Sequence, residues 1–68
     1  MWMNGMYRDN ISVGALVDIV LKQDQKTGKL TRGHVKHILT NSSYHPRGIK
    51  VMLVEGNQVG RVQRVITD

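Results

Sequence analysis

The sequence contains no cysteine, one proline and only three aromatic residues among its 68 positions. Without cysteine, no disulfide framework or thiolate zinc site holds so short a chain together. Secreted domains of this size usually depend on such cross-links, so we expect a cytoplasmic protein. The length leaves room for one domain with a thin core, and we expect its stability to be modest.

Long apolar runs are also missing. No segment approaches the roughly 18 consecutive apolar residues of a membrane-spanning helix, and the opening MWMNGMYRDN lacks the apolar run of a signal peptide. Neither export nor membrane insertion is expected. The same opening is polar and rich in methionine, and Gly5 interrupts any periodicity. We therefore predict a flexible N-terminal arm over residues 1–10 and a single domain over residues 11–68.

Acidic residues are few. Ten Lys and Arg stand against five Asp and Glu, which gives a net charge of +5 and an isoelectric point near 10.1. Seven of the ten cationic residues fall between Lys22 and Lys50, where Asp24 is the only acid. Such a bias favours a polyanionic partner, namely RNA, DNA or an acidic protein surface. The alternative is that the net charge only keeps the protein soluble.

Period-two alternation predicts a first strand over residues 13–22. Val17, Ile19 and Leu21 share one face of this segment, and polar side chains occupy much of the other face. A helix is the alternative here, but the density of β-branched residues and Gly14 both lower helix propensity. We therefore predict a strand.

The centre of the pattern is a β-hairpin with a long loop over residues 30–51. Its strands are predicted at residues 30–40 and 49–53, and the loop NSSYHPRG between them is rich in turn formers. His45–Gly48 fits a type I turn, with Pro at its second position and Gly at its fourth.

In the second predicted strand, the apolar residues Val35 and Ile38 are three positions apart, so strict alternation would place them on opposite faces. A β-bulge near Lys36 and His37 would return both apolar side chains to the core. Such bends let short strands curl into a small barrel. A further turn at residues 55–57 leads to the last strand, predicted over about residues 58–65.

Residues 22–29 form a polar hairpin tip in which Gly28 can adopt a positive φ. Gly28 and Lys29, followed by Thr31, resemble a phosphate-binding loop. That motif needs an earlier glycine where Gln23 stands. The segment is therefore interpreted as a solvated turn.

A short internal sequence repeat links the second predicted strand with the last one. The heptapeptide GHVKHIL from Gly33 has the same pattern as GRVQRVI from Gly60: Gly, basic, Val, polar, basic and two aliphatics. Each glycine would allow close approach of a neighbouring segment, and each Val would fill the core. These features predict an all-β fold, a small SH3-like barrel of four to five short antiparallel strands, with an OB-like barrel as the second choice.

Four segments carry a family resemblance: KQDQKTGKLT at 22–31, ILTNSS at 38–43, HPRGIKV at 45–51 and VGRVQ at 59–63. On these segments the chain resembles the YwbE-like family of small uncharacterised proteins. The likeness covers nearly everything from Met3 onward and is most specific around HPRGIKV. The resemblance implies the domain boundaries and implies no activity.

The three histidines do not form a convincing metal site. His34 and His37 lie an odd number of positions apart and face opposite sides of a regular strand. A bulge could bring them together with His45, but no Cys, Asp or Glu stands nearby in the sequence to complete a ligand set. We expect no metal and no cofactor.

A hydrolytic site would need Ser42 or Ser43 activated by His45, with a carboxylate to orient the imidazole. None of the five acidic residues stands near that loop in the sequence. Serines beside Asn in a loop usually cap backbone groups. We therefore expect that the protein is not an enzyme.

Nucleic-acid binding has a stronger physical basis. Lys and Arg side chains neutralise phosphates, and Tyr and His rings stack on exposed bases. With three aromatic residues in all, we expect backbone-dominated, weakly sequence-selective binding to structured RNA or a ribonucleoprotein, through a cationic face and the 41–48 loop. The predicted contact residues are Lys29, Arg32, Lys36, Tyr44, His45, Arg47, Lys50, Arg61 and Arg64.

The alternative is a protein-interaction module. Tyr44, His45, Pro46 and Met52 would then form an uncharged contact patch, or an open sheet edge would accept a partner strand. Small barrels serve both uses, so the fold class alone does not choose between them. The salt dependence of binding does, because phosphate contacts weaken steeply as salt rises.

Overall fold

Five strands and three short 3₁₀-helices make up most of the computed structural model, which describes residues 1–67. The strands are β1 (Trp2–Asn4), β2 (Leu16–Leu21), β3 (Thr31–Ile38), β4 (Lys50–Leu53) and β5 (Val59–Ile66). The 3₁₀-helices are η1 (Arg8–Asn10), η2 (Lys22–Asp24) and η3 (Glu55–Asn57). No helix in this described range is long and apolar enough to cross a lipid bilayer.

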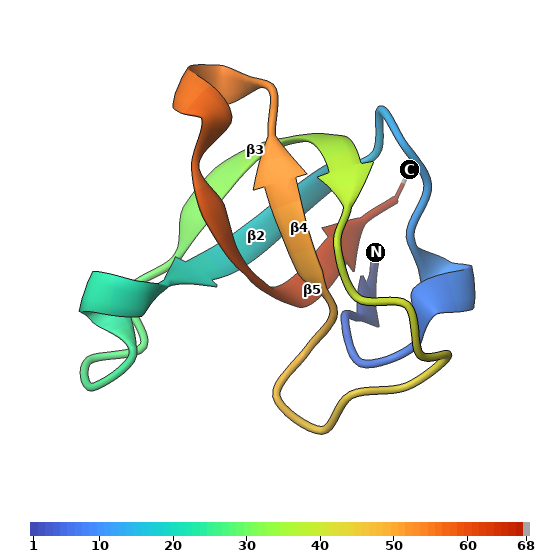
Figure 1. Ribbon diagram of the computed structural model, residues 1–68, viewed down its shortest axis with the longest axis horizontal. Coiled ribbons are helices and arrows are strands. Elements are labelled where there is room, and N and C mark those ends of the chain that lie inside the picture. The colour runs from blue at the N-terminus through green and yellow to red at the C-terminus, as the bar shows by residue number, and fades with distance from the viewer. Residues whose placement is uncertain (68) are drawn as a thin grey trace.

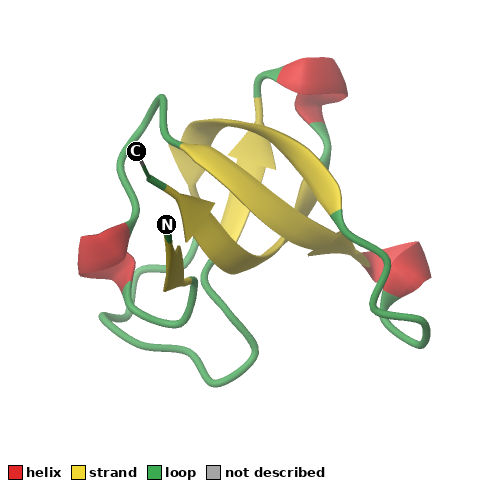
Figure 2. Cartoon of the chain, turned by 180° about the vertical axis from the view of Figure 1, so that it is seen from behind, coloured by secondary structure: helices red, strands yellow, loops and turns green. Residues whose placement is uncertain are grey.

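The strands form one antiparallel sheet in the order β1-β5-β2-β3-β4, and β4 pairs back onto β5. Strands β2 to β5 therefore close into a barrel, and Figures 1 and 2 show them wrapping around a common interior. The prediction of an all-β, SH3-like barrel is confirmed. The first predicted strand begins at Leu16 rather than at residue 13, and the other strands lie close to their predicted bounds.

Strand β5 has three partners. One of its edges pairs with β2 along most of its length. The other edge pairs with β4 at Val59–Arg61 and with β1 at Arg64–Ile66. Between these two pairings, the Val62 N–H donates to the Ile49 carbonyl at 2.8 Å and continues the hydrogen bonding along the edge.

The N-terminal residues differ from the flexible arm predicted over residues 1–10. β1 pairs with β5 in a defined register, Trp2 opposite Ile66 and Asn4 opposite Arg64. Gly5 is buried so closely against β5 that a Cβ atom there would lie 2.2 Å from the Val62 carbonyl oxygen. The sequence did not predict this strand, because three residues are too few to show an alternation of apolar and polar side chains.

The predicted hairpin between β3 and β4 is present, and its bulge lies where the apolar phase slips. Val35 pairs with Leu53 and His37 pairs with Met52, so the register shifts between Val35 and His37. The predicted turn before β4 is also present, because the Gly48 N–H donates to the His45 carbonyl at 3.0 Å.

The core contains nine buried aliphatic side chains, each of which contributes roughly 1.5–3 kcal/mol by burial. They are Ile11, Val17, Ile19, Val35, Ile49, Val51, Leu53, Val62 and Val65. The predicted close approaches at two glycines are confirmed. A Cβ atom at Gly60 would lie 2.5 Å from the Val20 carbonyl oxygen, and one at Gly33 would lie 2.7 Å from Leu53 Cδ1.

Candidate nucleic-acid interface

A pair of adjoining hollows lies on the outside of the barrel, where the β2–β3 hairpin tip, β5 and the 41–48 loop meet. Their volumes are about 410 and 370 Å³, and both are lined by Val20, Gln25 and Arg61. We call the two together the cationic groove. The residues that line only one of them are Lys22, Gly28, Arg47, Lys50, Val59, Gly60 and Gln63.

Sheet pairing places Arg61 at the centre of the groove. On β5 it stands opposite Val20 of β2 on one side and Lys50 of β4 on the other. Its Nη1 group donates to the Gly48 carbonyl at 3.0 Å, which directs the guanidinium toward the 41–48 loop. Two cationic side chains therefore occupy neighbouring strands at this position.

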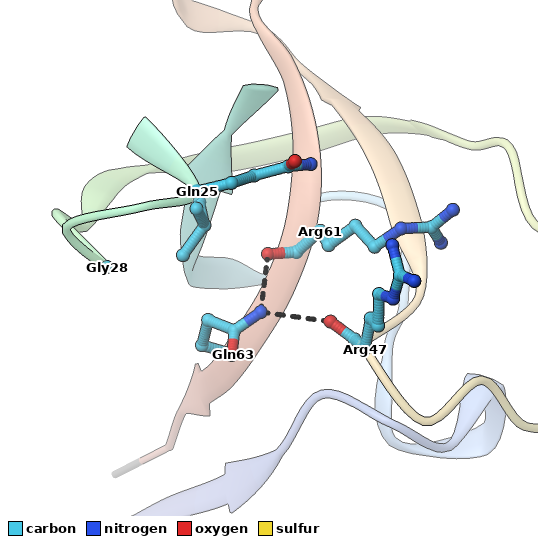
Figure 3. Close-up of a pocket in the computed structure, with 6 residues that line it drawn as sticks. Gln25, Gly28, Arg47, Arg61 and Gln63 are labelled. Atoms are coloured by element: carbon cyan, nitrogen blue, oxygen red, sulfur yellow. Dashed lines mark hydrogen bonds between the residues drawn. The ribbon is translucent and has the colours of Figure 1, made fainter. Parts of the chain in front are cut away.

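The loop contributes Arg47, and an amide side chain fixes its backbone. Gln63 Nε2 donates to the carbonyls of Arg47 and Arg61 at 3.1 and 3.2 Å. Figure 3 shows this pair of hydrogen bonds and shows the side chains of Arg47 and Arg61 extending toward each other. The next residue, Gly48, has φ +103°, and a Cβ there would lie 2.1 Å from the Val62 carbonyl oxygen. Glycine therefore lets the loop approach β5 closely enough to bring Arg47 into the groove.

No carboxylate neutralises this groove. None of its lining residues is Asp or Glu, and no ion pair within residues 1–67 involves Arg47, Lys50 or Arg61. The positive charges of the groove also affect the neighbouring imidazole of His45. Partial burial, and then the positive charges of Arg61 and Arg47, lower the pKa of His45 below its ordinary 6.5. His45 is therefore mainly neutral at pH 7.

Two other predicted contact residues, Arg32 and Arg64, are bound to Asp18 and form the Asp18 cluster with it. Arg32 donates to the carboxylate through Nε at 2.8 Å and Nη2 at 3.1 Å, and Arg64 through Nε at 2.6 Å. Asp18 is only 2% exposed. The hydrogen bond from Arg32 is the main cause of a pKa of Asp18 below its ordinary value, and Arg64 also lowers it.

The sheet register builds the Asp18 cluster. Asp18 on β2 stands directly opposite Arg32 on β3 and Arg64 on β5, so all three side chains project from the same face. Both guanidinium groups remain accessible, with 54% and 40% of the side-chain surface exposed. Neither lines the cationic groove, and one of their two charges is offset by Asp18.

Two other basic residues of β3, Lys36 and His34, contact the turn before β5. Lys36 Nζ donates to Asn57 Oδ1 at 3.0 Å. His34 binds Glu55 through its backbone N–H at 2.8 Å and through Nδ1 at 2.6 Å, and these contacts lower the pKa of Glu55 to about 2. Lys29 is exposed at the hairpin tip beside Gly28. None of these side chains lines the groove.

The aromatic and imidazole residues of the 41–48 loop face the N-terminal segment. Tyr44 forms an isolated antiparallel bridge with Tyr7, and the two rings lie 5.0 Å apart. The His45 N–H donates to the Met6 carbonyl at 2.9 Å, and His45 Nδ1 accepts the backbone N–H of Arg47 at 3.1 Å. His45 therefore connects the tyrosine pair to the groove.

The structure thus gathers Arg47, Lys50 and Arg61 from the predicted set, with His45 beside them. Sequence reasoning missed Lys22, which joins them because the end of β2 pairs with the start of β5. The register of β2 on β5 shifts between Asp18 and Ile19, so the alternation of side chains alone could not predict this alignment. It also missed Gln25 and Gln63, whose residue type carries no specific signal for a site, and Tyr7, which lies in the segment that was predicted to be a flexible arm.

The histidines do not gather around a metal position in the described part of the chain. Within residues 1–67, no three His, Cys, Asp or Glu side chains lie close enough together to hold an ion. His34 binds Glu55 and His45 belongs to the loop turn, so the two have separate partners.

Comparison with known proteins identifies relatives. A family model described as an uncharacterized conserved protein, DUF2196, matches residues 4–65. The uncharacterized protein YwbE of Bacillus subtilis (strain 168) is 62% identical over 65 residues, which cover 96% of this chain and 98% of that protein. No solved structure matches the chain. The resemblance predicted from its sequence segments is therefore confirmed: the chain belongs to this YwbE family.

Proposed function

We propose that the protein binds RNA through the cationic groove. The observation that supports this best is the convergence of Arg47, Lys50, Arg61 and Lys22 on one concave surface that has no carboxylate among its lining residues. Each guanidinium or ammonium group there can neutralise a phosphate and release a counterion, which is the main source of affinity for nucleic acids. The Asp18 cluster offers less, because one of its two charges is already offset.

RNA is the favoured polyanion for structural reasons. Sequence-specific reading of duplex DNA generally uses an α-helix or a two-stranded ribbon inserted into the major groove. Residues 1–67 contain no α-helix, and the groove is a concave surface between the sheet, a hairpin tip and a loop. We propose backbone-dominated, weakly sequence-selective binding to structured RNA, and a cytoplasmic location, consistent with a chain that has no cysteine.

The proposal is for a binding protein rather than an enzyme. His45 Nδ1 accepts a backbone N–H, and within residues 1–67 no hydrogen bond joins His45 to the hydroxyl of Ser42 or Ser43. The Ser43 carbonyl instead accepts the Arg8 N–H at 2.9 Å. These contacts support a structural role for the loop that carries Arg47.

The test compares two double variants of equal charge. R47A/R61A removes two groove cations, whereas K26A/K36A removes two exposed cations that do not line the groove, including Lys36 from the set predicted on sequence. Fluorescence anisotropy with a labelled RNA hairpin is recorded between about 50 and 200 mM salt. We expect R47A/R61A to lose roughly tenfold or more in affinity and to flatten the logarithmic salt slope by about 0.7–0.9 for each phosphate that is no longer neutralised. K26A/K36A should stay within about twofold of the original protein.

Equal losses in both variants would show that only overall charge matters and would contradict a groove-centred site. A flat salt response, or no RNA binding at low salt, would favour the protein-interaction alternative. That partner would use the 41–48 loop or the outer edge of β1, which pairs on its other side with β5.

A further inference from the structure

The two tyrosines form an exposed aromatic pair. Tyr7 and Tyr44 are 49% and 45% exposed, and their ring centroids lie 5.0 Å apart at an interplanar angle of 50°. This centroid distance falls within the range of about 4.5–7 Å over which aromatic rings attract each other. The pair nevertheless lies outside the hydrophobic core, so much of each ring remains open to solvent.

The backbone holds this pair in a fixed place. Hydrogen bonds connect the Arg8 N–H to the Ser43 carbonyl at 2.9 Å and the His45 N–H to the Met6 carbonyl at 2.9 Å, on either side of the Tyr7–Tyr44 bridge. Arg8 Nε also donates to the Thr40 carbonyl at 3.0 Å. These bonds join two segments that are distant in sequence. The rings are preorganised, so a ligand that stacks on them loses little free energy in ordering them.

The same loop leads from the aromatic pair to the cationic groove. Tyr44 precedes His45, whose Nδ1 accepts the backbone N–H of Arg47 at 3.1 Å, and Arg47 lines the groove. In Figure 1 the loop passes beside the N-terminal segment before it turns toward β4. A strand whose phosphates lie in the groove can therefore place a neighbouring base at the tyrosines.

We infer that the Tyr7–Tyr44 pair stacks on an unpaired base, so the bound RNA segment is single-stranded or looped. This inference depends on the proposed RNA binding in the groove. Bases in an A-form duplex are stacked on each other and present no free face, whereas unpaired bases can stack on aromatic rings. Such stacking tolerates any base, which fits the weakly sequence-selective binding proposed above.

The experiment separates stacking from phosphate contact. Y7L/Y44L keeps apolar bulk and removes the rings, and Y7F/Y44F keeps the rings as a matched control. Affinity is measured for a short single-stranded RNA and for a duplex of equal length. We expect the Leu variant to lose roughly 5- to 100-fold on the single strand and less than about twofold on the duplex, with an unchanged salt slope. The Phe variant should retain the original affinity for both.

Unchanged single-strand affinity in the Leu variant, or an equal loss on the duplex, would overturn the stacking assignment and leave the groove proposal standing. Absence of any RNA binding by the original protein would overturn both. If the Leu variant does not fold by circular dichroism, the tyrosine ring signals of the original protein are followed by NMR during RNA addition. Shifts with the single strand alone support the inference, and unshifted signals overturn it.

Discussion

Two arginine pairs on the outside of this barrel have the same chemistry and different surroundings. Arg32 and Arg64 bind one carboxylate, Asp18, which is 2% exposed. Arg47 and Arg61 line a groove without a carboxylate, and their hydrogen-bonded neighbours are backbone carbonyls and an amide. The comparison shows that net positive charge alone does not locate a binding surface. What matters is which cations already have an anionic partner inside the protein.

The largest expected difference is in stability. R32A/R64A removes three hydrogen bonds to the Asp18 carboxylate and uncovers it to water, so the free energy of unfolding should fall by roughly 1.5–3 kcal/mol. R47A/R61A removes one hydrogen bond to a carbonyl and should cost within about 1 kcal/mol. Urea unfolding followed by circular dichroism measures both variants against the original protein.

A third change sharpens this comparison. Adding D18N to R32A/R64A removes the charge that has lost both of its partners, so part of the lost stability should return. If both arginine pairs destabilise the fold equally, or if D18N recovers nothing, the Asp18 cluster does not have the role described.

A smaller effect is expected on the stability of the fold at acidic pH. The folded pKa values of Asp18 and Glu55 lie below their ordinary 3.8 and 4.5, the latter at about 2. A depressed carboxyl pKa stabilises the fold above the unfolded pKa, and this contribution disappears as pH falls through the folded value. Stability should therefore decline progressively from about pH 4.5 toward pH 2. Chemical unfolding across this range measures the decline.

Variants can show which carboxylates cause the loss of stability at low pH. E55Q removes one titrating group, so its stability should fall less steeply between these pH values than that of the original protein. R47A/R61A should keep the original pH dependence, because its groove has no carboxylate. A changed acid profile in the groove variant would break the distinction between the two arginine pairs.

The smallest effect is in binding. His45 has a lowered pKa beside Arg47 and Arg61 and is mainly neutral at pH 7. A bound polyanion offsets the arginine charges and raises that pKa, so protonation and RNA binding favour each other. RNA affinity should rise a few-fold between about pH 7 and pH 5. H45Q should reduce the rise in anisotropy titrations, and an identical rise in H45Q would remove His45 from the interface.

Much of the fold was predictable because its signals are local. The three-residue step from Val35 to Ile38 predicted the bulge, and glycine at positions 33 and 60 predicted close packing. The short β1 carried no such signal. Its place in the sheet depends on pairing with β5, at the other end of the chain, and nothing in WMN encodes that register.

The site was predictable only in part, for a related reason. A list of cations does not reveal that Asp18, which alternates onto the outer face of β2, is covered by two arginines from neighbouring strands. Nor does it reveal that Lys22 and Lys50 flank Arg61, because this depends on the β2–β5 and β4–β5 registers together. Residue types indicated the chemistry, and only cross-strand pairing selected the residues.

Strand β5 pairs with β1, β2 and β4, and it follows all three of them along the chain. While a nascent chain is still emerging, β1 has no partner, β2 lacks one neighbour and the barrel stays open. Closure must therefore wait until β5 has left the ribosome, and then proceeds through contacts between distant segments, which form slowly. Until that moment the tyrosine-bearing loop and the arginines of β5 belong to a chain that has no groove.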